Sequence, residues 1–199
     1  MEKILFDAHA HINEERFSEM DRNKIAKEIE KSQVAYVIDA AFNIRSSRQA
    51  LSDAEKYPWC YAIVGIHPHD SKELDENALS QLREMSRHPK VKGIGEIGLD
   101  FYYDRSERDV QRKGFRRQIR LANELKLPIV IHSRDADAET MEILREEGAF
   151  SSERQSFFPY RRDENGEKVP DSRVLIHCYS GSKEMAREYV KLGATISIC

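Results

Sequence analysis

The sequence predicts an α/β fold in which a parallel sheet is covered by helices. Short apolar runs alternate along the whole chain with segments in which apolar residues recur at helical spacing. Short apolar runs of this kind suit strands that are buried on both faces. Strictly alternating strands and helices are typical of parallel sheets with helical crossovers.

Seven apolar runs are expected to form the strands. They cover residues 4–6, 34–41, 60–65, 91–98, 127–132, 173–178 and 194–198. Helical spacing is found between them at Ile25 and Ile29, at Leu74, Ala78, Leu82 and Met85, and at Phe115, Ile119, Ala122 and Leu125. A further helix can begin after Ser182 and end at Gly193, because serine is a favoured helix N-cap and glycine a favoured helix end.

The length and composition predict a single domain over residues 1–199, with 40% hydrophobic and 34% charged residues among 199. One segment, 151–173, breaks the alternation of strand and helix. It holds five basic and five acidic residues together with two phenylalanines, a tyrosine and an Asn-Gly pair. Because so many balanced charges cannot be buried, we expect an inserted surface segment in the form of a long loop or a small hairpin.

Several classes of protein are excluded. The formal net charge of -3 argues against a globally basic nucleic-acid coat but leaves room for a local anion site. No apolar run approaches the roughly 20 residues that span a bilayer, so no membrane association is expected. The three cysteines, Cys60, Cys178 and Cys199, lack CxxC spacing and are expected to be reduced. These features together predict a cytoplasmic protein.

Histidines and one glutamate stand where the predicted strands end. His9 and His11 follow the first strand, and side chains two residues apart on a strand share a face, so both can converge on one ion. The carboxyl ends of parallel strands meet at one edge, where the active site of such a fold is built. The residues expected to meet there are His9, His11, Glu96, His132 and His177.

Four histidines and a glutamate exceed what a single structural zinc uses, and they suit two divalent metal ions. Glu96 comes from a middle strand and is the residue expected to bridge the two ions. Two such ions activate a water and stabilise charge on a phosphoryl or carbonyl oxygen, so the predicted chemistry is hydrolysis. Imidazole and carboxylate ligands accept Mg, Mn, Zn or Ni, and the ligands do not distinguish among them.

Other polar residues near these strand ends have two interpretations. His67 and His69 flank Pro68 and are either surface residues of a loop structured by proline or, for at least one of them, substrate-facing. Arg134 offers a planar fork that matches phosphate, with an ion pair to a nearby loop acid as the alternative. Asp100, Tyr102 and Tyr103 either position ligands and stack on a base or merely cover the rim of the sheet.

Five segments of the chain, 7–11, 65–70, 95–103, 131–135 and 176–182, resemble successive signature motifs of the TatD family of metal-dependent deoxyribonucleases. The resemblance implies a TIM-barrel-like fold of the amidohydrolase type and cleavage of DNA phosphodiester bonds, often from a 3′ end. It further implies that His9 and His11 bind one metal, that Glu96 bridges, and that His132 and His177 bind the second. His67 and Arg134 match family positions near the substrate phosphate.

The chain departs from the family pattern in two places. Ala10 stands where the family usually has Cys or a similar small residue. The family barrel has an eighth strand that ends in an aspartate within a Thr-Asp-(Ala/Ser)-Pro motif, and the chain is expected to hold seven of eight strands without it. That aspartate would be a metal ligand and the base for the attacking water, so the catalytic base is left unassigned. We therefore expect a fragment, a chain completed by a second polypeptide, or a chain that has lost activity.

The leading hypothesis is a TatD-type hydrolase with DNA as its substrate. One competing hypothesis keeps the metals but assigns an amidohydrolase activity on C–N or ester bonds. Such enzymes usually carry a carboxylated lysine as the bridge, whereas Glu96 has that position here. The other hypothesis is a catalytically silent chain that only binds DNA or protein, and the absence of the family aspartate favours it. The sequence makes no prediction of oligomeric state.

Overall fold

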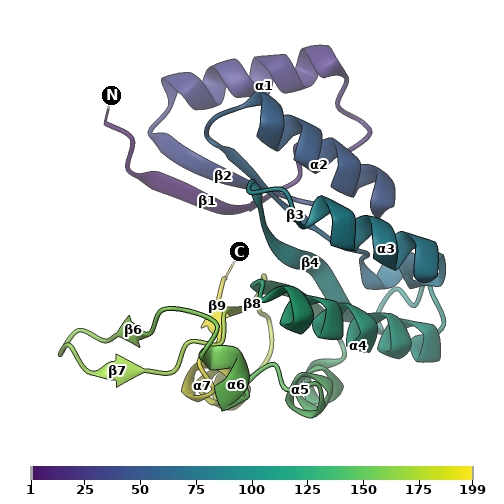
Figure 1. Ribbon diagram of the computed structural model, residues 1–199, viewed down its shortest axis with the longest axis vertical. Helices are drawn as coiled ribbons and strands as arrows, with labels where there is room; N and C mark the ends of the chain where they lie inside the picture. Colours follow the sequence, from purple (N-terminus) through teal and green to yellow (C-terminus); the bar gives the residue numbers. More distant parts are fainter. Residues whose placement is uncertain (1, 199) are drawn as a thin grey trace.

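The computed structural model describes residues 2–198 and shows a curved parallel sheet with helices on one side (Figure 1). The strand order is β1-β2-β3-β4-β5-β8-β9, so β1 and β9 are the edges. The strands are β1 (Leu5–Ala10), β2 (Val34–Ala40), β3 (Cys60–Val64), β4 (Val91–Asp100), β5 (Ile129–Arg134), β8 (Val174–Ile176) and β9 (Thr195–Ile196). Every neighbouring pair is parallel. The predicted α/β class and the seven strands are confirmed.

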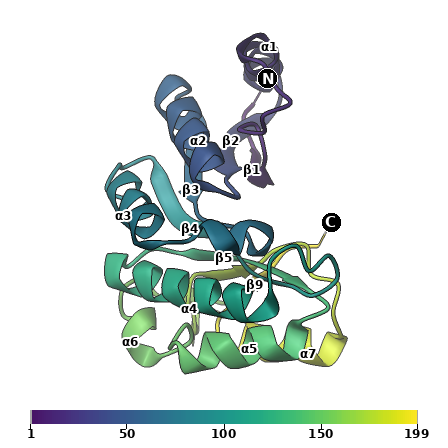
Figure 2. The ribbon, with the colours of Figure 1, turned by 90° about the vertical axis from the view of Figure 1, so that its right-hand side faces the viewer.

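The helices connect successive strands and lie against the same side of the sheet (Figure 2). They are α1 (Glu19–Lys31), α2 (Ile44–Lys56), α3 (Glu76–Met85), α4 (Arg108–Leu125), α5 (Asp137–Glu146) and α7 (Lys183–Lys191), with a 3₁₀ turn η1 (Pro68–Glu73) before α3. Within residues 2–198, none of them is long and apolar enough to cross a membrane.

The helix ends follow from local side-chain chemistry. The Ser182 side chain accepts a hydrogen bond from the Met185 N–H and begins α7 as predicted, and Gly193 follows that helix with a φ of +87°. Leu74 was expected on a helix face, but it ends η1, because the Asp75 carboxylate caps α3 one residue later. The helices α2 and α5 were not singled out from their apolar spacing.

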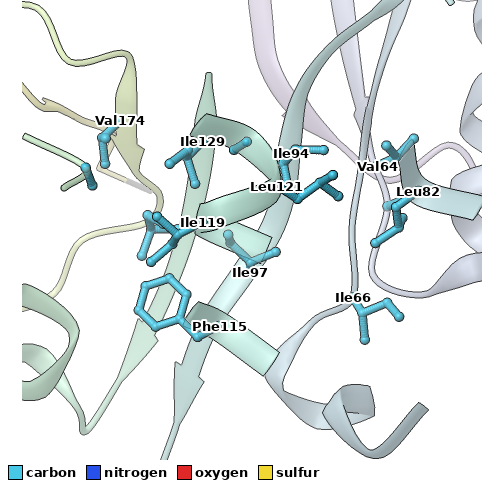
Figure 3. Packing of buried hydrophobic residues seen from close by; sticks show 14 of the residues in the cluster. Val64, Ile66, Leu82, Ile94, Ile97, Phe115, Ile119, Leu121, Ile129 and Val174 are labelled. Atoms are coloured by element: carbon cyan, nitrogen blue, oxygen red, sulfur yellow. The ribbon is translucent and has the colours of Figure 1, made fainter. Parts of the chain in front are cut away.

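The main core lies between the sheet and the helices (Figure 3). Ile94, Ile97 and Ile129 of the sheet pack against Phe115 and Ile119 of α4, and all five side chains are buried. The opposite face of the sheet carries a smaller cluster of Ala40, Ile63 and Val130, contributed by strands alone. Cys60 is buried and Cys178 is exposed, both as free thiols, while Cys199 lies outside the described residues.

Three strands continue further than predicted. β1 runs to Ala10, β4 to Asp100 and β5 to Arg134, so His9 lies within β1 and not after it, and Glu96 and His132 lie further from the ends of their strands than predicted. β4 and β5 come unusually close at Gly98, whose φ is +146°. A Cβ at Gly98 would lie 1.9 Å from the carbonyl oxygen of His132, so only glycine fits there.

The segment 151–173 forms the short helix α6 (Ser152–Gln155) and a two-stranded hairpin of β6 (Arg161–Arg162) and β7 (Lys168–Val169), which extends away from the sheet in Figure 1. Its base is held by the fully buried Arg154. The guanidinium donates to the carbonyl oxygens of Ser172 and Leu127 at 2.9 and 2.8 Å and to Asn123 Oδ1 at 2.6 Å. The charged tip of the segment is exposed to solvent.

Candidate metal centre

Glu96 stands at the centre of the histidine cluster. It lies in β4 and is 5% exposed. Its Oε2 is 3.4 Å from His9 Nε2 and its Oε1 is 3.3 Å from His132 Nδ1. Burial alone would raise the pKa of the Glu96 carboxyl, but the neighbouring imidazoles of His132 and His9 hold that pKa well below its ordinary value. The carboxylate therefore stays ionised, with one oxygen turned toward each side of the site.

One group of potential ligands consists of His9, Glu96 and His177. One donor atom from each lies within 4.8 Å of the other two. The rings of His9 and His177 stack with centroids 3.5 Å apart, so the carboxyl ends of β1 and β8 approach each other across the curled sheet. Burial, together with the neighbouring His9, lowers the pKa of His177 to about 4. His177 is therefore a neutral imidazole at neutral pH, as metal ligation requires.

A second group consists of His67, Glu96 and His132, with donor atoms equally close together. The rings of His67 and His132 are 4.3 Å apart at an angle of 64°. Burial lowers the pKa of His67 to about 3, so this imidazole is also neutral. Glu96 belongs to both groups, as a bridging ligand would.

Asp100, at the end of β4, lies beside His132 of the second group. Its fully buried carboxylate places Oδ2 2.9 Å from His69 Nε2 and 3.0 Å from His132 Nε2. Both nitrogens of His132 thus face a carboxylate. Burial tends to lower the pKa of His132, but Glu96 and Asp100 together raise it above its ordinary value. Carboxylates in this position orient a ligating histidine and fix its tautomer.

His11 belongs to neither group. Its ring meets the edge of His9 at a centroid distance of 4.9 Å, and its Nδ1 lies 2.7 Å from the carbonyl oxygen of Ala40. The loop that carries His11 is held by Asp39, which is buried in β2 and accepts the backbone N–H groups of Ile12 and Asn13. His11 also lines the pocket described below.

The residues of the cluster fit a divalent ion. His9 is well buried, yet neither of its ring nitrogens has a hydrogen-bond partner among residues 2–198. Burying such groups unpaired is costly unless something else satisfies them. Imidazole nitrogens around an ionised carboxylate are a donor set that divalent transition metals prefer.

An open pocket of about 370 Å³ lies over the cluster. It is lined by His11, His67, His69, Glu96, Asp100 and His132, and also by Glu14, Phe42, Asp70, Tyr103, Arg105 and Arg134. Arg134 makes no ion pair with any carboxylate among the described residues. Its guanidinium lies over the rings of Tyr102 and Tyr103 instead. The described residues therefore do not contain the ion pair with a loop acid that was the alternative interpretation of Arg134.

The predicted residues thus come together, but in a different grouping. The resemblance paired His132 with His177, whereas the structure groups His177 with His9 and brings His67, predicted to face substrate, beside His132. Asp100 was expected either to position ligands or to cover the rim, and its contacts favour the first. The supporting role of Asp39 was not found from the sequence, although its place at a strand end matched the pattern of the other site residues.

The structure is a parallel α/β half-barrel, and imidazoles surround a buried carboxylate at the carboxyl edge of its sheet. This combination defines the class of metal-dependent hydrolases. The chain belongs to the family of TatD-related DNases, whose family model matches residues 6–199. It is 36% identical over 194 residues to an uncharacterized metal-dependent hydrolase, YabD, of Bacillus subtilis, covering 98% of this chain and 68% of that protein. It is 30% identical to the 3′-5′ ssDNA/RNA exonuclease TatD of Escherichia fergusonii, covering 98% of this chain and 66% of that protein.

Solved structures agree with the fold. The TatD homologue YjjV of Escherichia coli superposes with a TM-score of 0.75 at 26% identity, over 96% of this chain and 66% of that one. A TatD family hydrolase of Entamoeba histolytica gives a TM-score of 0.79 at 20% identity, over 100% of this chain and 65% of that one. The chain therefore spans about two thirds of the length of the proteins it matches, and the predicted TIM-barrel-like fold is confirmed.

Proposed function

We propose that this chain carries most of the centre of a two-metal deoxyribonuclease that hydrolyses phosphodiester bonds of single-stranded DNA from the 3′ end. The observation that carries the proposal is Glu96, whose two oxygens face His9 on one side and His132 on the other. The nuclease names of relatives such as the Escherichia fergusonii protein support the substrate. The proposed ligands are His9, His11, Glu96, His132 and His177.

Each residue has a proposed task. Two divalent ions, when bound, supply the Lewis acidity that a phosphodiester substrate needs. Glu96 would hold both ions with its two carboxylate oxygens, and Asp100 keeps His132 oriented through its Nε2. His67 lines the pocket beside Glu96 and faces the substrate phosphate, although its distance from His132 also permits ligation. Arg134, which lines the same pocket, holds a phosphate oxygen with its planar fork.

The base for the attacking water is not assigned to a residue of this chain. The Thr-Asp-(Ala/Ser)-Pro motif that the resemblance provides for this role does not occur within the 199-residue sequence. We further propose that residues 1–199 act as one hydrolase domain in which 151–173 is an inserted segment. The cytoplasmic location stays a prediction.

The test combines metal analysis with a nuclease assay. The chain is stripped with a chelator, dialysed against Mn²⁺ and incubated with 5′-labelled single-stranded DNA, alongside a version extended through the following coding sequence. We expect bound Mn²⁺ in both forms and 3′-end shortening in the extended form, with both lost in Glu96→Gln. His88→Ala is the matched control, because His88 lies outside the site near Glu55.

Absence of bound metal and of cleavage in the extended form would overturn the proposal. Turnover of amides or esters without DNA cleavage would favour the amidohydrolase alternative. DNA binding that needs no divalent ion and survives Glu96→Gln would favour the silent binding chain.

A further inference from the structure

Two exposed tyrosines lie beside Arg134 and form a small surface with it, and the proposed hydrolysis uses neither tyrosine. Tyr102 and Tyr103 are 58% and 48% exposed, and their rings meet edge to face with centroids 4.8 Å apart. The guanidinium carbon of Arg134 lies 4.2 Å from the centroid of Tyr102 and 4.7 Å from that of Tyr103. We call these three residues the tyrosine platform.

The platform is tied to the metal centre through Asp100. The backbone N–H groups of Tyr102 and Tyr103 donate to Asp100 Oδ1 at 3.2 and 2.8 Å, while Oδ2 of the same carboxylate faces His132. The Tyr103 ring also meets the edge of His69 at 5.5 Å. The backbone that carries the two half-exposed rings is thereby held at a defined position relative to Glu96.

The charge of the platform suits an anionic aromatic ligand. Arg134 has no carboxylate partner among residues 2–198, and Arg105 lies over the Tyr103 ring at 5.4 Å. Tyr103, Arg105 and Arg134 are exposed and line the same pocket as Glu96. A guanidinium group that lies over a ring face is attracted to the ring. It still has N–H groups that can donate to phosphate oxygens.

We propose that the tyrosine platform stacks an unpaired nucleobase next to the phosphodiester that lies over Glu96, with Arg134 holding the adjoining phosphate. Stacking on aromatic rings tolerates any base, because every base has a π face. A duplex hides that face, so the platform selects single strands and frayed ends. This inference rests on the proposed function, since it names how the same site recognises its substrate.

The test measures binding and not cleavage. The probe is a 5′-fluorescein-labelled ten-nucleotide oligothymidine with phosphorothioate linkages, and the comparison probe carries abasic residues at its last two 3′ positions. Fluorescence anisotropy is recorded with Mn²⁺ for the unsubstituted chain, for Tyr102→Leu/Tyr103→Leu, and for Tyr160→Leu. Leucine keeps apolar bulk but removes the ring face. Tyr160 is the matched control, because it is an exposed tyrosine of the insertion with Arg162 and Lys168 over its ring.

We expect the double variant to bind the full probe about tenfold or more weakly, with little change for the abasic probe. The unsubstituted chain and Tyr160→Leu should both prefer the full probe, and a blunt duplex of the same sequence should bind less well. Equal binding of the two probes by the unsubstituted chain, no binding of either, or an equal loss of both in the double variant would overturn the proposal.

Bound Mn²⁺ and circular dichroism are measured on the same samples. A double variant that keeps its fold and metal but loses base preference supports the platform. Failure of cleavage or of metal binding in the unsubstituted chain counts against the proposed function, whereas equal binding of the full and abasic probes by a metal-loaded chain counts against the platform.

Discussion

The rings of His9 and His177 stack face to face, with centroids 3.5 Å apart and planes inclined by 7°, although one residue belongs to β1 and the other follows β8. Two protonated imidazoles would repel each other at this separation. Burial lowers the pKa of His177 to about 4, which removes that repulsion at neutral pH. The contact therefore joins two distant parts of the sheet into one group of potential ligands around Glu96.

Replacing one histidine in either group should remove one metal ion and leave the other bound. His9→Ala and His132→Ala are each expected to lower the bound Mn²⁺ from about two equivalents to about one, because each variant leaves the other group intact. Metal content after dialysis is measured by mass spectrometry, with His88→Ala as the control. Loss of all metal in both variants would show one shared position, and no loss in either would exclude these ligands.

Asp100 should influence metal affinity without binding the metal. Asp100→Asn keeps the shape of the side chain but weakens the interactions with His69 Nε2 and His132 Nε2. Mutation of such supporting carboxylates typically costs about 10–100-fold in metal affinity, and we expect a loss in that range. Calorimetric titration with Mn²⁺ measures it. Asp104→Asn is the control, because Asp104 is an exposed neighbour paired with Arg108, and equal affinity in Asp100→Asn and the unsubstituted chain would contradict the prediction.

Asp39 should make stability depend on pH. Burial raises the pKa of its carboxyl from an ordinary 3.8 to about 7, and Oδ2 has no hydrogen-bond partner among the described residues. Between about pH 4 and pH 7 the folded chain holds a proton on Asp39 that the unfolded chain has released. The free energy of unfolding therefore has its full value, with respect to this group, below about pH 4 and falls as the pH rises to about 7.

Asp39→Asn keeps an acceptor for Ile12 and Asn13 but cannot ionise. The unfolding free energy of the unsubstituted chain, relative to that of the variant, should fall by up to about 4 kcal/mol over this range. Urea unfolding of both chains at several pH values measures the difference. A difference that stays constant from pH 4 to 7 would contradict it.

Arg154 should be a stability residue. Its buried guanidinium donates to three acceptors, so Arg154→Met leaves buried carbonyl and amide oxygens unpaired. We expect a loss of about 2–4 kcal/mol in the free energy of unfolding. Urea unfolding measures it, and Arg161→Met on the exposed hairpin strand serves as the control. A loss no larger than that of the control would show that the base of the insertion does not depend on this residue.

Much of the fold could be predicted from the sequence, because it depends on local patterns. Apolar runs of strand length predict the seven strands of the parallel sheet, and Ser182 predicts where α7 begins through its own hydrogen bond. The convergence of histidines at one edge likewise follows from the parallel order of the strands, since their carboxyl ends must meet there. The alternating pattern of His9 and His11 predicts that the two side chains share a face, and their rings lie 4.9 Å apart, although His11 joins neither group of potential ligands.

Which side chains share a group was decided only by the tertiary structure. The pairing of His9 with His177 depends on how far the sheet curls, and that of His67 with His132 depends on how η1 packs against β4. The close approach of β4 to β5 at Gly98 depends on backbone geometry that no local pattern records. Curvature and packing result from many weak long-range contacts. The sequence by itself therefore determined the ligand types and their common edge of the sheet, and only the tertiary structure determined which side chains lie together.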